Sequence, residues 1–191
     1  MDFTLSAEQQ AIRDAVFRIL NPGGPLGDDY WLARDRDGGF PHEFFGAIAR
    51  DGWLGIAMPE QYGGAGLGIT EAALLMQAIA ESGAGMAGAS AVHLNIFGLN
   101  PVVVFGTAAQ KERWLPPMIR GEVKACFAVT EPNTGLNTLA LQTRADRRGD
   151  GYILSGQKIW TSTAQVANKM LILARTTPLE SIGRSTGGLS L

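Results

Sequence analysis

The residues with the clearest chemical potential lie in one stretch, Cys-Phe-Ala-Val-Thr-Glu-Pro-Asn-Thr-Gly-Leu-Asn, from Cys126 to Asn137. Its apolar start predicts a short strand over 127–130, and the Pro and Gly that follow predict a turn. A strand edge beside such a turn offers backbone N–H donors and the Thr130 hydroxyl to a planar polar ligand. On spacing alone a purely structural β-turn is the better explanation, so both interpretations stay open at this point.

A second candidate, Gly83-Ala84-Gly85-Met86-Ala87-Gly88, matches the Gly-x-Gly-x-x-Gly pattern of dinucleotide-binding proteins. That pattern works when a strand precedes the first glycine, so that the pyrophosphate meets a helix N-terminus. Here the end of a predicted helix, 79–82, precedes it. Because 25 of the 191 residues are glycine, a chance match is expected. We interpret the stretch as a turn between two helices.

Metal and nucleophile chemistry have little support in the sequence. His42 and His93 are the two histidines, and neither has a cysteine or carboxylate at ligand spacing. His93 falls within a predicted buried helix, where lining a ligand pocket is the alternative to packing. Cys126 has no paired base and is expected to be a small core residue. The sequence therefore predicts no metal site and no catalytic nucleophile.

Composition narrows the class of protein. The net charge is −2, and 18% of residues are charged against 46% that are apolar. This balance disfavours a nucleic-acid binder and excludes a disordered chain. The start of the chain lacks a signal peptide, and no apolar run approaches the length of a membrane span. One cysteine fits a reducing compartment, so we expect a cytoplasmic globular protein.

Residues 1–121 are predicted to form a helical domain. Ser6 with Gln9, and Thr107 with Gln110, have the spacing of capping boxes that begin helices. A helix after Pro41 carries Phe44, Phe45 and Ile48 on one face.

Two further helices in this domain, over 70–81 and 86–97, are apolar on most sides and are predicted to be buried. Thr70 is the predicted cap of the first of them, and residues 86–97 are a candidate wall of a ligand pocket. Residues 35–39 are expected to be a loop in a polar stretch, and Pro116 with Pro117 is expected to stop the last helix.

Residues 122–191 change to the pattern of an antiparallel sheet. Residues 141–146 alternate apolar and polar, 147–151 form a turn, and 152–154 begin the return strand. A buried strand is predicted over 169–175. The last residues, 187–191, look like a strand without a partner, which suggests a truncated chain. The predicted fold class is α+β, a helical domain followed by an incomplete antiparallel β domain.

Taken together, several motifs give the chain a specific resemblance. The segment 126–137 and Gly156-Gln157-Lys158-Ile159-Trp160-Thr161-Ser162 are similar to the two flavin-contacting motifs of the acyl-CoA dehydrogenase family. The stretches 53–68 and 106–117 also resemble that family, in the same order along the chain. The resemblance covers nearly the whole sequence and implies a cofactor, FAD.

The resemblance assigns roles to individual residues. It places the strand along the flavin ring, with the Thr130 hydroxyl and backbone groups at polar ring atoms, and it packs Trp160 against the ring. Ser162 stands where the family usually has threonine, and it keeps the hydroxyl that points toward flavin N5. The implied cofactor-binding residues are Phe127, Val129, Thr130, Gly135, Leu136, Trp160, Thr161 and Ser162.

Two departures from the family pattern weaken the implied ligand contacts. Leu136 stands where the family commonly has a serine near the flavin pyrophosphate and the acyl-CoA substrate, and leucine offers only its backbone N–H. Asn137 replaces a common acid. The cofactor class is unchanged by these differences, but the fine geometry around Leu136 is not expected to follow the family.

For the resembled family the reaction is α,β-dehydrogenation of an acyl-CoA thioester, with hydride transfer to FAD and electrons passing to an electron-transfer flavoprotein. The family's catalytic base belongs to a C-terminal helical domain, so no catalytic residue is expected here and the chain alone is expected to be inactive. Glu131 is expected to brace the turn before Pro132. A homodimer or homotetramer is implied. The alternatives are a non-catalytic remnant that binds flavin or acyl-CoA, and a related flavin monooxygenase.

Overall fold

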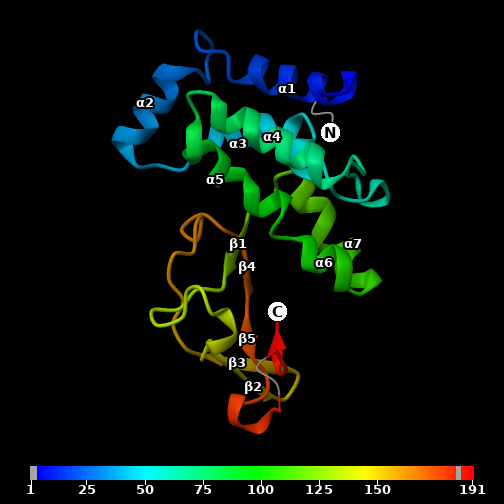
Figure 1. The fold of residues 1–191 in the computed structure, drawn as a ribbon, viewed down its shortest axis with the longest axis vertical. Helices are drawn as coiled ribbons and strands as arrows, with labels where there is room; N and C mark the ends of the chain where they lie inside the picture. Colours follow the sequence, from blue (N-terminus) through cyan, green and yellow to red (C-terminus); the bar gives the residue numbers. More distant parts are fainter. Residues whose placement is uncertain (1–3, 184–185) are drawn as a thin grey trace. The chain divides into compact units, whose positions relative to one another are not determined.

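Amphipathic helices build the first part of the chain, and short strands build the rest (Figure 1). The computed structural model describes residues 4–183 and 186–191. It divides into two units, Met1–Ala125 and Cys126–Leu191.

In the first unit, helix α4 packs against both α1 and α5 (Figure 1). The side chains at the centre of this packing have no exposed surface, among them Val16, Phe44, Ile48, Leu75 and Val92. Burial of such apolar area is the main stabilising contribution to the unit. Its elements are α1 (Ala7–Ile19), α2 (Asp28–Asp37), α3 (His42–Arg50), η1 (Trp53–Gly55), η2 (Glu60–Tyr62), α4 (Ile69–Glu81), α5 (Gly85–Ile96), α6 (Asn100–Phe105) and α7 (Ala108–Ile119).

Both predicted capping boxes are confirmed, but the predicted cap of α4 is wrong. The Gln9 amide donates to Ser6 Oγ at 3.1 Å, and the Gln110 amide donates to Thr107 Oγ1 at 3.2 Å. Helix α4 begins after Gly68 rather than at Thr70, because the Gly68 amide donates to Glu71 Oε2 at 3.0 Å. A side chain three residues into the helix therefore satisfies the first free donor.

Helix α2 occupies most of the stretch predicted as a loop, which is a correction. Asp28 and Asp29 stand in the first turn, where negative charge favours the helix dipole, whereas in the last turn Arg34 and Arg36 alternate with Asp35 and Asp37. The indole of Trp31 is buried, with its Nε1–H donating to the Leu26 carbonyl at 2.9 Å. Gly38, at φ +66°, then ends the helix in the left-handed conformation.

Helix α7 continues through Pro116 and Pro117 to Ile119, although the prolines were expected to stop it. Each proline removes one amide donor, but its carbonyl remains available. The Arg120 amide donates to the Pro116 carbonyl at 3.1 Å, and the Glu122 amide donates to the Pro117 carbonyl at 3.0 Å. The last turn therefore keeps its hydrogen bonds.

The glycine-rich match at 83–88 lies where α4 ends and α5 begins: Gly83 and Ala84 form the predicted turn, and residues 85–88 are already the first turn of α5. Gly88 allows close packing there, since a Cβ atom at this position would lie 2.6 Å from the Ala84 Cβ. Helices α4 and α5 were predicted to be buried on most sides, but each also has exposed residues. Ile69 and Met86 are largely exposed, at 68% and 76%.

One stretch of the described chain, Gly85–Phe105, is long and apolar enough to pass a test for a membrane span by length and composition. Half of its most apolar window is buried inside the protein, and residues 97–99 interrupt it between α5 and α6. A core helix of a globular protein passes the same test. The expectation that no apolar run approaches the length of a membrane span is therefore wrong for Gly85–Phe105.

The second unit contains a mixed sheet rather than the purely antiparallel one predicted. Strand β2 pairs antiparallel with β3 and parallel with β5, with Arg144 opposite Arg175. Strand β6 pairs antiparallel with β5, so the C-terminal residues do have a partner. The described strands are β1 (Ala125–Ala128), β2 (Arg144–Arg148), β3 (Gly151–Ser155), β4 (Lys169–Ile172), β5 (Ala174–Arg175) and β6 (Leu189–Ser190), with single turns η3 (Thr138–Ala140) and η4 (Leu179–Ser181).

Strand boundaries differ from those predicted in three places. Strand β2 begins at Arg144 rather than at residue 141 and continues to Arg148, and β3 begins at Gly151, so the turn predicted over 147–151 is confined to residues 149 and 150. Strand β1, which pairs with β4, ends at Ala128, so Val129 and Thr130 lie just beyond it. The predicted buried strand over 169–175 is two strands, and its first residues, Lys169 and Met170, are exposed. The break falls at Leu173, whose amide donates to the Ala128 carbonyl at 3.0 Å.

Candidate functional site

Strand β1 presents the first predicted flavin-contacting segment. Cys126 and Ala128 are buried on one side of the strand, whereas Phe127 is only half-buried, as the alternation of strand side chains requires. Beyond the strand, the backbone amide and the hydroxyl of Thr130 form no hydrogen bond with any described residue. Both groups of Thr130 are therefore available to donate to a ligand.

The turn after this segment is closed by a pair of backbone hydrogen bonds. The Glu131 amide donates to the Thr134 carbonyl at 3.0 Å, and the Thr134 amide donates to the Glu131 carbonyl at 3.1 Å. Pro132 and Asn133 form the tip. Gly135 and Leu136 follow it, and the Leu136 side chain is fully exposed.

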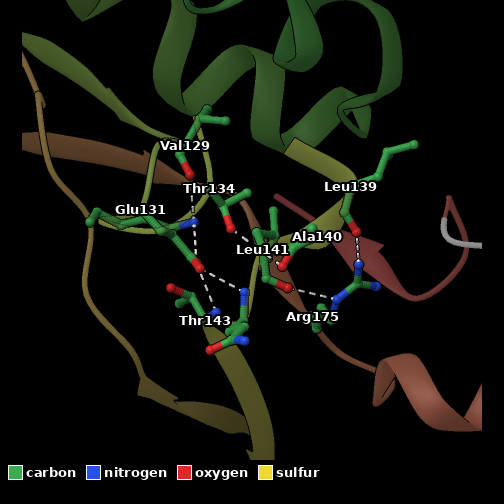
Figure 2. A network of polar contacts seen from close by, with 10 residues as sticks. Val129, Glu131, Thr134, Leu139, Ala140, Leu141, Thr143 and Arg175 are labelled. Atoms are coloured by element: carbon green, nitrogen blue, oxygen red, sulfur yellow. Dashed lines mark hydrogen bonds and ion pairs between the residues drawn. The ribbon is translucent and has the colours of Figure 1, made fainter. Parts of the chain in front are cut away.

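The Glu131 carboxylate braces this turn, as expected, and it is the most densely bonded acid of the site (Figure 2). It accepts from the Gln142 amide at 2.7 Å, from the Thr143 amide at 2.8 Å and from Lys158 Nζ at 3.0 Å. Burial alone raises the pKa of Glu131, but the hydrogen bonds from Thr143, Gln142 and Lys158 outweigh burial and lower the pKa to about 2.

The second predicted segment, 156–162, meets the first one. The Ile159 amide donates to the Thr130 carbonyl at 3.0 Å. Lys158 Nζ donates to the Val129 carbonyl at 2.8 Å and also to Glu131 Oε1 at 3.0 Å. The two segments are thus joined by both a backbone and a side-chain hydrogen bond.

Trp160 has an unusual backbone in this segment. Its φ is +57°, and its indole is 85% exposed. A bulky residue in the left-handed region costs about 1–3 kcal/mol and is found mostly where function requires it. The Ser162 amide donates to the Trp160 carbonyl at 3.1 Å, which stabilises this bend. Thr161 is half-buried and Ser162 is exposed beside it.

The structure therefore brings together some predicted site residues and not others. Val129 and Thr130 lie against the 158–160 segment, and Phe127 precedes them on β1. Gly135 and Leu136 form no hydrogen bond with either segment in the described part of the chain. What each of these residues binds remains a prediction.

Sequence reasoning missed Arg175, which is 4% exposed at the end of β5. Its guanidinium donates to the carbonyls of Leu139 and Leu141, the latter at 2.9 Å (Figure 2). It also donates to the Gly187 carbonyl at 3.3 Å. It thereby anchors the segment between the turn and β2. Its position in the sequence could have identified it, because Arg175 directly follows the apolar run 170–174. A charged side chain at the end of such a run is buried only if it finds hydrogen-bond partners.

The first unit contains two hollows that involve the candidate pocket wall at 86–97. One, of about 470 Å³, is lined by Met58, Leu67, Ile96, Phe97 and Val103 among others. The other, of about 730 Å³, is lined by Trp31, Arg34, Met86 and Ala87 among others. His93 lines neither of them, and its Nδ1 lies 3.0 Å from the Ser90 carbonyl.

Cys126 is buried, as expected of a core residue, and burial raises the pKa of its thiol. Within residues 4–183 and 186–191, no group of three His, Cys, Asp or Glu side chains is placed to hold a metal ion.

Family models match almost the entire chain. The model described as acyl-CoA dehydrogenase, N-terminal domain, matches residues 6–122, and the model described as acyl-CoA dehydrogenase, middle domain, matches residues 126–191. The chain therefore belongs to the acyl-CoA dehydrogenase family, as the resemblance indicated.

Individual relatives agree with this assignment. Acyl-CoA dehydrogenase FadE12 of Mycobacterium tuberculosis is 34% identical over 178 residues, which are 91% of this chain and 44% of the relative. Butyryl-CoA dehydrogenase from Megasphaera elsdenii, a solved structure, is 32% identical with a TM-score of 0.79, over 93% of this chain and 46% of that one. A solved FAD complex of PigA is 27% identical with a TM-score of 0.82, over 93% and 46%. The chain thus spans less than half the length of these proteins.

Proposed function

We propose that this chain is the flavin- and thioester-binding part of an FAD-dependent acyl-CoA dehydrogenase. The observation that carries the proposal is the junction of the two segments, where the Ile159 amide bonds the Thr130 carbonyl and the Thr130 donors remain available. Membership of the family and the FAD complex of a structural relative support the cofactor.

The donor set fits FAD. The edge of the oxidised flavin ring carries acceptors that gain negative charge on reduction, and the Thr130 amide and hydroxyl are donors suited to them. The exposed indole of Trp160 offers an aromatic face for packing against the ring. Phe127, Val129, Thr161 and Ser162 are proposed to complete this side of the site.

FAD held by these residues would supply a hydride acceptor for the β-hydrogen of an acyl-CoA. The chain's own residues bind and orient: Thr130 donates hydrogen bonds to the ring edge and Trp160 excludes water from one face.

The α-proton needs a base, and we propose that it comes from outside this chain, which alone is inactive. Glu131 is unsuited to the role because two amides and an ammonium occupy its carboxylate. A pKa of about 2 also makes it a weak proton acceptor at neutral pH.

Leu136 is the position where binding is proposed to be weaker than in the family. Its exposed side chain offers no hydroxyl to the flavin pyrophosphate or the thioester. This departure favours the second candidate function, a non-catalytic relative that only binds flavin or acyl-CoA. An electron-transfer flavoprotein as acceptor, a homodimer or homotetramer, and a cytoplasmic location complete the proposal.

The test is a titration of the protein, expressed from its complete reading frame, with FAD. We expect saturable binding, weakened about fivefold by Thr130→Val and about tenfold by Trp160→Ala. Thr138→Val, in the turn η3 of the same unit, is the matched control. Absence of FAD binding, or equal affinity in all variants, would overturn the proposed site.

Anaerobic addition of butyryl-CoA then separates the candidate functions. Bleaching of the flavin absorbance identifies a dehydrogenase. Retained colour identifies a binding protein, and rapid reaction of the chemically reduced flavin with oxygen to give a hydroxylated product identifies a monooxygenase.

A further inference from the structure

The ammonium group of Lys158 contacts both flavin-site segments at once. It donates to the Val129 carbonyl at 2.8 Å and to Glu131 Oε1 at 3.0 Å. The side chains of Lys158 and Glu131 are only 10% and 7% exposed, so the ion pair is almost fully withdrawn from water. Both groups are therefore held in one geometry.

A buried ion pair of this kind is a poor means of stabilising a protein, because desolvation offsets most of the attraction between the charges. An apolar pair of similar volume would serve stability as well. What the pair supplies is a defined position, since a compact ammonium donates to two acceptors set at fixed directions. Its contacts thus point to a role in geometry.

The geometry controlled is that of the next residues. Lys158 bonds the Val129 carbonyl, and the adjacent Ile159 amide bonds the carbonyl of the next residue, Thr130. Two consecutive carbonyls on one segment therefore hold two consecutive residues on the other. Trp160 follows immediately in its left-handed conformation, which persists only where its neighbours are fixed.

The Glu131 carboxylate extends this control to the chain beyond the turn. Besides the Lys158 ammonium, the carboxylate accepts hydrogen bonds from the backbone amides of Gln142 and Thr143, at the entry to β2. Lys158 is therefore tied through Glu131 to the sheet, as well as directly to Val129. The residues directly before Trp160 are therefore bonded both to the 129–130 segment and, through Glu131, to the entry of β2.

We propose that Lys158 is a positioning residue of the flavin site: its bonds to Val129 and Glu131 set the distance and angle between the Thr130 donors and the Trp160 indole. It touches neither cofactor nor substrate in this role. The inference rests on the proposed function, because the ring that both groups contact is the proposed flavin.

The experiment compares Lys158→Met and Lys158→Arg with Lys169→Met, an exposed lysine of the same unit. Arginine keeps the charge, but its planar, longer head cannot reproduce the two directions of the ammonium. We expect both Lys158 variants to bind FAD at least tenfold more weakly, and the control to bind as the parent protein does.

A readout without flavin accompanies the titration. The ¹⁹F resonance of 5-fluorotryptophan at position 160, assigned with Trp160→Phe, is expected to shift in both Lys158 variants. The amides of the β2–β3 hairpin are expected to keep their hydrogen-exchange protection in Lys158→Arg, which shows that the unit remains folded. If Lys158→Met does not fold, Lys158→Arg alone decides.

The outcomes separate the two proposals. A folded Lys158→Arg protein with an unchanged Trp160 resonance and unchanged FAD affinity would overturn the positioning role and leave the proposed function intact. If the parent protein binds no FAD, the proposed function fails. The Trp160 resonance then still reports whether Lys158 holds the indole, and an unshifted resonance refutes that as well.

Discussion

Replacing Glu131 with glutamine tests how strongly this carboxylate holds the second unit together. Its hydrogen bonds lower the pKa from an ordinary value of 4.5 to about 2. Each pKa unit corresponds to about 1.4 kcal/mol, so the ionised group stabilises the folded unit by roughly 3 kcal/mol at neutral pH. Glutamine cannot accept from two amides and an ammonium together, and Glu131→Gln is expected to lose most of that amount.

The pH dependence follows from the direction of the change. Because the folded pKa lies below the unfolded one, the contribution is fully present above pH 4.5 and is lost as pH falls toward 2. The stability difference between parent and variant is therefore expected to be roughly 3 kcal/mol at pH 7 and near zero at pH 2.

The assay is urea unfolding followed through the amide NMR signals of β2 and β3, which report on the second unit alone. Glu180→Gln, at an exposed position on η4, is the control and is expected to change stability by less than about 0.5 kcal/mol. A difference between Glu131→Gln and parent that stays constant from pH 7 to pH 2 would refute the reasoning. So would a Glu131 carboxyl ¹³C signal that titrates near 4.5.

Three further substitutions give expected outcomes. Leu136→Ser restores a hydroxyl at an exposed position and is expected to tighten FAD binding about fivefold in the same titration, whereas an unchanged affinity would remove residue 136 from the pyrophosphate site. Asn95→Ala leaves the carbonyls of Met118 and Val123 and the Ala125 amide without their buried partner, so the first unit is expected to lose about 3 kcal/mol in urea unfolding followed by helical circular dichroism. The exposed Asn100→Ala is its control, and equal losses would contradict the role of the hydrogen bonds. Arg175→Met keeps an apolar stem but removes the donors to Leu139, Leu141 and Gly187, and hydrogen exchange of residues 139–141 is expected to accelerate at least tenfold.

The helical part of the fold was predictable where the signals are local. Capping boxes at Ser6 and Thr107 and the apolar face at 44–48 depend on residues three or four apart, and the structure confirms them. Helix α2 was missed because its stability comes from the buried Trp31 and the terminating Gly38 rather than from an apolar stripe. Tertiary packing decides such polar segments.

Sheet topology was less predictable, for a physical reason. Pattern and turn residues indicate hairpins such as β2–β3, whose partners are close in sequence. The parallel pairing of β2 with β5 joins Arg144 to Arg175, and no local pattern encodes such a partner. The expectation of a purely antiparallel sheet failed at this pair.

For the candidate site, resemblance rather than periodicity placed the segments 127–130 and 158–162 in one site. The Ile159–Thr130 and Lys158–Val129 hydrogen bonds bring these segments together. The role of Glu131 as a brace followed from its place before Pro132, but its three donors come from residues 11 to 27 positions away. Such partners become visible only in the folded chain.

Cys126 gives the protein an internal reporter of motion. It is the single thiol of the sequence and lies on β1, immediately before Phe127, with 1% of its surface exposed. An alkylating reagent reaches it only when the strand opens, and the raised pKa slows the reaction further. The alkylation rate of unmodified protein therefore measures how often the strand beneath the proposed flavin ring separates from its neighbours.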